Sequence, residues 1–132
     1  MALNASLVGK TYPTVRVAID EERVRTFAQA VDHRGPGVPP TILTVPEIEA
    51  GLRNVVSDPE VGVDLARVLH GEQTYEWSRP VVTGETLVAD ASIESIRGRG
   101  AMQFLTLRTD IRDERGDRVA TARSTLLIRD QT

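Results

Sequence analysis

The sequence predicts an α+β domain in which an antiparallel sheet wraps around one central helix. Helical periodicity fills the first half of the chain and alternating apolar residues fill the second half. Helices that cover one face of such a sheet define the α+β class. Hydrophobic residues make up 40% of the chain but aromatic residues only 4%, so the core is aliphatic. A length of 132 residues fits a single domain spanning 1–132.

The first part predicts a strand followed by a helix. Apolar residues alternate between Tyr12 and Ile19, which indicates a short strand or extended arm. Asp20 is then the expected N-cap, with two glutamates in the first helical turn. Apolar residues at i, i+3, i+4 and i+7 predict that one face of this helix is buried: Val24, Phe27, Ala28 and Val31.

A second, longer helix is expected after a stiff loop over 33–40 that is rich in glycine and proline. Residues 44–47 match a capping box, with Thr44 as the cap, Pro46 in the first turn and Glu47 reaching back. The helix is predicted to end near 57–59. Its apolar stripe makes it the central core helix: Ile48, Leu52, Val55 and Val56.

Four strands are predicted in the second half, over 68–77, 86–96, 102–111 and 118–128. Hairpin connections are expected at 97–100 and 113–117. Tyr75 and Trp77 share a strand face and are interpreted as core or interface anchors. A sheet of this kind around a long helix is the hot-dog arrangement. Its unpaired edge strands predict dimerisation.

Composition excludes several classes of function. The net charge is −3 with interspersed charges, so no nucleic-acid footprint is present. Cysteine is absent, and the two histidines lack metal-ligand spacing, so no metal site is expected. Neither a signal-peptide pattern nor a membrane-length apolar stretch occurs. A cytoplasmic protein without a membrane association is therefore expected.

Four segments carry a family resemblance: residues 1–12, 38–41 (Val-Pro-Pro-Thr), 69–73 (Leu-His-Gly-Glu-Gln) and 79–85 (Arg-Pro-Val-Val-Thr-Gly-Glu). Together they resemble the MaoC-like hot-dog dehydratases. The resemblance is strongest to the small accessory subunits of the actinobacterial (3R)-hydroxyacyl-ACP dehydratases. It implies a subunit of an R-specific 3-hydroxyacyl-thioester dehydratase or enoyl hydratase in fatty-acid metabolism. The substrate would be acyl-CoA or acyl-ACP, and no cofactor would be needed.

Catalytic members of this family have the loop Gly-Asp-x-Asn-Pro-x-His, whose Asp and His activate one water. If Pro36 is aligned with the motif proline, His33 takes the aspartate position and Val38 the histidine position. If Asp32 is taken as the aspartate, Gly37 stands where histidine is needed. One partner is missing either way, so no catalytic residue is expected here. The resemblance then implies a substrate-binding half that works with a catalytic hot-dog partner, or a homodimer.

Substrate-binding candidates follow from the same resemblance. Relatives polarise the thioester carbonyl near the start of the core helix, and the acyl tunnel is expected along that helix with Leu43 and Leu52. A rigid lead into the helix is the alternative for its two prolines. His70 and Glu72 are expected on one strand face, with a solvated polar pair as the alternative. The candidates are Pro40, Thr41, Ile42, Val45, His70, Glu72 and Gln73.

Two other functions remain open at this point. One is a self-sufficient homodimeric hot-dog hydratase or thioesterase using His33, Asp32 or His70. The other is a non-enzymatic acyl-thioester binding module. Arg97 and Arg99 lie in a hairpin that is no phosphate loop, although they could contact a carrier protein or a coenzyme A phosphate. The sequence does not specify the acyl chain length, the carrier or the oligomeric state.

Overall fold

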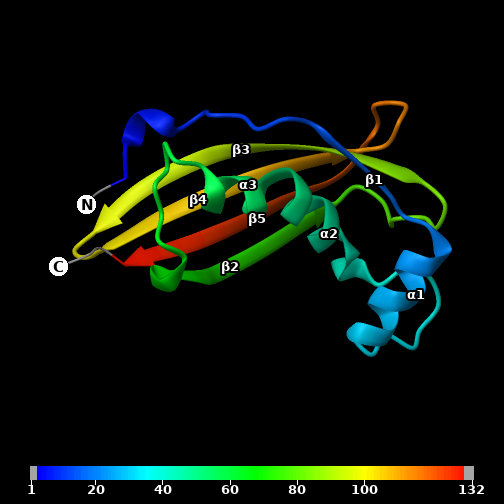
Figure 1. Ribbon diagram of the computed structural model, residues 1–132. Helices are drawn as coiled ribbons and strands as arrows, with labels where there is room; N and C mark the ends of the chain where they lie inside the picture. Colours follow the sequence, from blue (N-terminus) through cyan, green and yellow to red (C-terminus); the bar gives the residue numbers. More distant parts are fainter. Residues whose placement is uncertain (1–2, 130–132) are drawn as a thin grey trace.

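The computed structural model describes residues 3–129, which form one five-stranded antiparallel sheet with helices on one face (Figure 1). The strand order is β1-β3-β4-β5-β2, so β1 and β2 are the edges. This is the predicted hot-dog architecture. The strands are β1 (Val15–Ala18), β2 (Val68–Trp77), β3 (Thr86–Arg99), β4 (Met102–Arg112) and β5 (Arg118–Arg129).

The central helix is a continuous run over 40–57 that changes its pitch three times. It comprises η2 (Pro40–Leu43), α2 (Thr44–Glu47), the π-helical η3 (Ile48–Leu52) and α3 (Arg53–Ser57). Pro46 has no N–H to donate to the preceding turn, which favours a local change in helix type. The end predicted near 57–59 is confirmed.

The predicted capping box is wrong. No side chain caps α2, because the helical run has already begun four residues earlier at Pro40. Proline is well tolerated at a first helical position, since its fixed φ suits the helix and its missing N–H is not needed there. Glu47, expected to reach back to the cap, is instead buried against the sheet with 1% of its surface exposed.

Gly51 marks the closest approach of the central helix to the sheet. A Cβ built there would lie 2.5 Å from Leu107 Cδ2 and 2.9 Å from Ala91 Cβ. The predicted inner faces of the strands are buried around this contact, which confirms the alternation read from the sequence. The fully buried members include Leu87, Ala89, Leu105, Leu107, Ala120 and Ala122.

Helix α1 (Glu21–Ala30) begins at Asp20 as predicted, because the Asp20 carboxylate accepts a 2.8 Å hydrogen bond from the Arg23 N–H. The prediction of a buried face is wrong in extent. Val24 and Phe27 are only partly buried, and Val31 lies beyond the helix with 47% of its surface exposed. The reason is the position of α1, which lies beyond the end of the sheet (Figure 1).

The extended N-terminal segment runs alongside β3 and is tied to the end of α3. Only Val15–Ala18 forms a strand, which is shorter than the predicted 12–19. Lys10 Nζ lies 2.6 Å from an Asp58 carboxylate oxygen, and the Tyr12 hydroxyl donates to the same carboxylate at 2.8 Å. The hydrogen bond from Lys10 is the main cause that lowers the pKa of Asp58. Within residues 3–129, no helix has the length and apolar character needed to cross a membrane.

Candidate functional site

Asp32 and His33 are not brought together around one position. Asp32 adopts φ 54°, and its carboxylate, 77% exposed, accepts a 2.9 Å hydrogen bond from Arg34 Nε. The His33 N–H donates to the Ala28 carbonyl at 2.9 Å, whereas its ring Nε2 is buried without a hydrogen-bond partner among residues 3–129. General acid–base chemistry on a single water needs both groups within hydrogen-bond reach of it. The described part of the chain has no such carboxylate–imidazole pair here.

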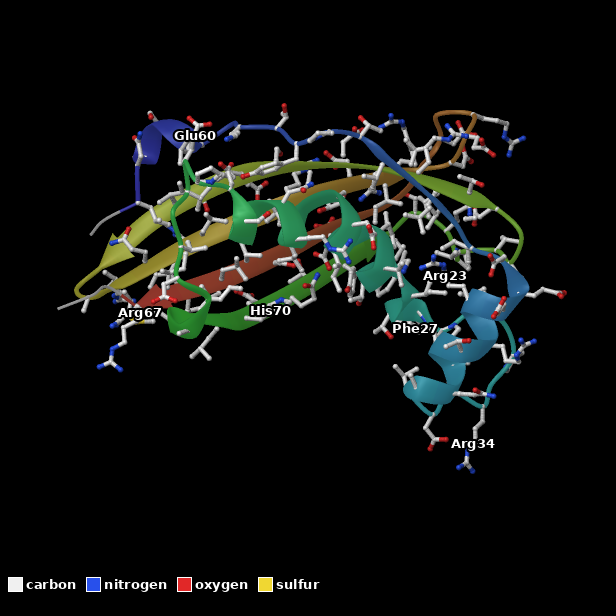
Figure 2. The ribbon with its side chains drawn as sticks, in the orientation of Figure 1. Arg23, Phe27, Arg34, Glu60, Arg67 and His70 are labelled. Atoms are coloured by element: carbon white, nitrogen blue, oxygen red, sulfur yellow. The ribbon has the colours of Figure 1, made fainter. Side chains whose placement is uncertain are left out.

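His70, the third catalytic candidate, lies elsewhere. Figure 2 places His70 on β2, well separated from Arg34, which follows His33 in the chain. His70 and Glu72 do not share a face, so this prediction is wrong. A β-bulge at Gly71 shifts the register from His70↔Leu126 to Glu72↔Thr125. Directly paired residues share a face, so His70 lies on the helix side and Glu72 on the outer side.

Gln73 returns to the helix side opposite Ser124 and belongs to a buried polar group, here called the Glu47 cluster. The Glu47 carboxylate accepts hydrogen bonds from the Gln73 amide at 2.9 Å, from the Tyr75 hydroxyl at 3.2 Å and from the Ser124 hydroxyl at 2.6 Å. The cluster therefore joins α2 to β2 and β5. Its members are Thr44, Glu47, Gln73, Tyr75 and Ser124.

Tyr75 links the two ends of this cluster. Its hydroxyl lies 2.8 Å from Thr44 Oγ1 as well as near Glu47. Burial raises the pKa of Tyr75 to about 12, the Thr44 hydrogen bond opposes the rise, and the Glu47 carboxylate adds to it. Tyr75 is therefore a neutral hydroxyl at physiological pH and serves as a hydrogen-bond donor, not as a base.

A surface groove of about 510 Å³ lies where β2 ends beside the start of the central helix. Trp77 is 44% exposed there, and its ring lies 5.5 Å from that of Tyr75, so the groove adjoins the Glu47 cluster. A cavity of this size with mainly apolar walls suits part of a small organic ligand. We call it the Trp77 groove. It is lined by Val38, Pro40, Trp77, Ser78, Arg79, Pro80 and Val81.

Arg79 fixes one wall of the Trp77 groove through two carboxylates. Its guanidinium lies 2.7 and 3.0 Å from the two Glu85 oxygens and 3.2 Å from Asp113 Oδ2. Burial tends to raise the pKa of Glu85, but hydrogen bonds from Arg79 and the Val82 N–H outweigh it and lower that pKa. Burial also tends to raise the pKa of Asp113. Hydrogen bonds from the Asp117 N–H and from Arg79 outweigh this effect, so the pKa of Asp113 is lowered.

The predicted binding residues are thus dispersed over the molecule. Pro40 lines the Trp77 groove, and Thr41 is exposed beside it. Ile42 and Leu43 are completely buried in the core. Val45 lines a separate groove beneath α1. Only Gln73 enters the Glu47 cluster.

Sequence reasoning missed Glu47 and Ser124 as partners. The spacing from Thr44 to Glu47 matched a cap, and a serine in an alternating strand carries no signal of its own. The interpretation of Tyr75 and Trp77 as core or interface anchors is the sequence-based observation that points to this part of the molecule. No group of residues within 3–129 could hold a metal ion.

Comparison with known proteins defines the class. Residues 6–122 match the family model "FAS1-like, dehydratase domain region". A UPF0336 protein from Streptomyces coelicolor is 34% identical over 147 aligned positions, covering 98% of this chain and 97% of the relative. The aligned positions outnumber the 132 residues of this chain, so the relative has residues without a counterpart here.

Solved structures agree on the fold. A chain of the HadBC (3R-hydroxyacyl-ACP dehydratase) complex from Mycobacterium tuberculosis superposes with a TM-score of 0.76 at 21% identity, covering 92% of this chain and 96% of that one. A MaoC-like dehydratase gives a TM-score of 0.77 at 26% identity, covering 95% of this chain but 43% of that one. This chain belongs to the MaoC-like hot-dog dehydratase family.

Proposed function

We propose that this chain is the substrate-binding subunit of an R-specific 3-hydroxyacyl-thioester dehydratase or enoyl hydratase. Such an enzyme adds water across, or removes it from, the C2–C3 bond of an acyl-CoA or acyl-ACP. In this proposal a second hot-dog polypeptide contributes the catalytic Asp and His. The reaction takes place in the cytoplasm and needs no cofactor.

The observation that carries the proposal is the separation of Asp32 from the ring of His33. The Asp32 carboxylate points to solvent with Arg34 as its partner, while His33 Nε2 is buried and unpaired among the described residues. A water activated by both groups has no place between them. This arrangement supports a second chain as the source of the catalytic groups.

The shape of the sheet supports a partner. β2 is an edge strand of ten residues that pairs only with β5, whereas the other edge strand, β1, has four residues. Long unpaired edges tend to recruit another strand. Leu69 and Trp77, near the two ends of β2, are 67% and 44% exposed. The solved relative HadBC is a complex, and the MaoC-like dehydratase has more than twice the length matched here.

The Trp77 groove is the part of this chain that we assign to the acyl thioester. Its apolar walls suit an acyl group, and rigid prolines at 40 and 80 hold its shape. The Glu47 cluster behind it presents neutral hydroxyl and amide groups. Ile42 and Leu43 pack too tightly to line a tunnel, so their role is in the core.

Reconstitution tests the proposal. The chain is purified alone and also co-expressed with a tagged family member that retains the Asp/His loop, and both preparations are assayed for hydration of crotonyl-CoA. We expect co-purification, and turnover only in the complex. Turnover by the isolated chain would contradict the proposal. Ligand binding with neither partner nor turnover would favour a simple binding module.

A pair of variants locates the interface and the groove. Trp77→Ala should reduce co-purification or raise KM in the complex. Val31→Ala removes an equally exposed apolar side chain (47%) from the region after α1 and should do neither. Equal effects of the two substitutions would argue against a role for the Trp77 groove.

A further inference from the structure

The outer face of the sheet, opposite the helices, has two different ends. At its centre and toward the hairpin that joins β4 to β5, three of its arginines are paired with acids. Arg108 and Arg123 share Glu94, Arg123 also contacts Glu76, and Arg112 contacts Asp90. Arg118 at this end has no carboxylate partner in the described part of the chain but donates hydrogen bonds to Ser78 and Thr121. The charges here are thus mostly satisfied within the sheet and offer little to an ionic partner.

The other end combines arginines with apolar side chains. The register aligns Arg99, Met102 and Arg129 in one row across β3, β4 and β5. The next row on the same face aligns Arg97, Phe104, Leu127 and Leu69. The row between them points inward, because Gln103 and Ile128 are buried.

A groove of about 700 Å³ lies over this end, between the hairpin that joins β3 to β4 and the turn that precedes β2. Leu69, Met102 and Leu127 form its apolar floor, and Arg67 and Arg129 also line it. We call this surface the basic groove. Figure 2 places Arg67 at the opposite end of the molecule from Phe27 and Arg34. The basic groove is therefore distinct from the Trp77 groove at the far end of β2.

Three arginines at this end of the sheet have no acidic partner within residues 3–129. Arg97, Arg99 and Arg129 form no ion pair with any described residue, and Asp64, the one acid lining the groove, lies 3.6 Å from Arg67. The whole chain has a net charge of −3. A basic surface on an acidic protein favours an anionic occupant, and it disfavours the same surface of a second copy.

We infer that the basic groove binds an acidic amphipathic α-helix of a partner protein. Three strand spacings separate β3 from β2, a width of about 14 Å. A helix with its side chains is about 10–12 Å across. Its apolar stripe would cover Leu69, Met102 and Leu127, and its flanking carboxylates would reach Arg97, Arg99 and Arg129. A phosphate backbone would leave the apolar floor uncovered.

The test uses a lactam-bridged helical peptide of about 18 residues, ~27 Å long, with a leucine stripe flanked by glutamates. Binding to the full chain is measured by NMR titration of amide and methionine methyl signals. We expect shifts at Leu69, Met102 and Leu127, and weaker binding in higher salt. The same peptide with lysine in place of glutamate should not bind. Failure of the glutamate peptide to bind, or shifts elsewhere, would overturn the inference.

Two variants make the test specific. Arg97→Gln with Arg99→Gln should raise Kd roughly three- to ten-fold, as expected for two exposed charge pairs. Arg34→Gln with Arg115→Gln, two exposed arginines distant in sequence, should leave Kd unchanged. Leu69→Ser should weaken binding, whereas Val82→Ser, 58% exposed near the Trp77 groove, should not. If each control variant weakened binding as much as the variant it is matched to, the inference would be overturned.

A vesicle assay separates a protein helix from a lipid surface. Vesicles of phosphatidylglycerol and phosphatidylcholine are sedimented with the chain. We expect no co-sedimentation that depends on Arg97 and Arg99. Binding to vesicles that is lost in the double variant, without binding to the glutamate peptide, would replace the helix by an anionic membrane. These binding measurements do not depend on crotonyl-CoA turnover. The inference about the basic groove can therefore fail while the proposed function stands.

Discussion

Gly51 illustrates how one residue sets the distance between the central helix and the sheet. A Cβ at this position would meet Leu107 Cδ2 at 2.5 Å and Ala91 Cβ at 2.9 Å. Leu107 is fully buried and Ala91 is 1% exposed, so neither has free space to move into. Alanine has the higher helix propensity, yet the close approach requires glycine.

We therefore expect Gly51→Ala to destabilise the protein by about 1–3 kcal/mol, the usual cost of overpacking. This loss exceeds the gain of about 1 kcal/mol in helix propensity. Urea unfolding followed by circular dichroism measures it. Arg53→Ala, on the exposed side of the same helix, should stay within about 0.5 kcal/mol of the parent. A Gly51→Ala protein as stable as the parent would show that the helix can shift without cost.

Glu47 is the second residue whose buried environment determines how a substitution changes the stability of the protein. It accepts three hydrogen bonds while almost fully buried, and no described cation contacts it. Glu47→Gln should change stability by no more than about 1 kcal/mol. The new carbonyl can accept from Ser124 and Gln73, and the new amide can donate to Tyr75, whose proton then goes to Thr44.

Glu47→Leu has a similar size but cannot accept hydrogen bonds. It leaves buried donors on Gln73, Tyr75 and Ser124 without this acceptor, at a cost of about 1–3 kcal/mol. Urea unfolding of both variants should rank leucine well below glutamine. Equal stabilities would mean that the Glu47 cluster is satisfied by water or by rearranged side chains.

At the scale of elements, patterns of apolar residues predicted the four long strands and the central helix, because burial acts on whole faces. Local exceptions were not predictable in the same way. The bulge at Gly71 reverses the faces of His70 and Glu72, and an alternating pattern cannot reveal one extra residue. The start of the helix at Pro40 displaced Glu47 from a cap to the core. Partners such as Ser124 lie 77 residues from Glu47 and become neighbours only in the fold.

Arg79 joins two elements, the connection after β2 and the hairpin between β4 and β5, through Glu85 and Asp113. Both carboxyl groups have lowered pKa values in the folded chain. Their stabilisation is therefore complete above the ordinary carboxyl pKa and is lost as the pH falls through the lowered values. Removing Arg79 should raise both pKa values, so the loss begins at higher pH.

Acid unfolding should accordingly occur at higher pH in Arg79→Gln than in the parent. Tryptophan fluorescence during an acid titration measures the midpoint, since Trp77 lies beside Arg79 in the Trp77 groove. Arg16→Gln is the matched control, because the ion pair of Arg16 with Glu114 is largely exposed on both sides. An unchanged midpoint in Arg79→Gln would show that backbone hydrogen bonds alone keep these carboxylates ionised.

At the scale of the whole molecule, the asymmetry of the two sheet edges predicts which edge pairs with a partner chain. β1 is short, and the segment that precedes it is held alongside β3 by backbone hydrogen bonds from Gly9 and Tyr12. β2 has ten residues and one open side. In a strand, successive N–H groups point to opposite sides, so about half of those in β2 face away from β5.

Hydrogen exchange of the amides checks this prediction. In the isolated chain, alternate residues of β2 should exchange rapidly while their neighbours, bonded to β5, stay protected. When the catalytic partner is bound, the fast set should become protected by at least about ten-fold, because each amide would then open only with the interface. Residues 15–18 of β1 serve as the internal control and should not change. Protection confined to α1 or β1 would place the partner elsewhere and would remove the structural basis for pairing through β2.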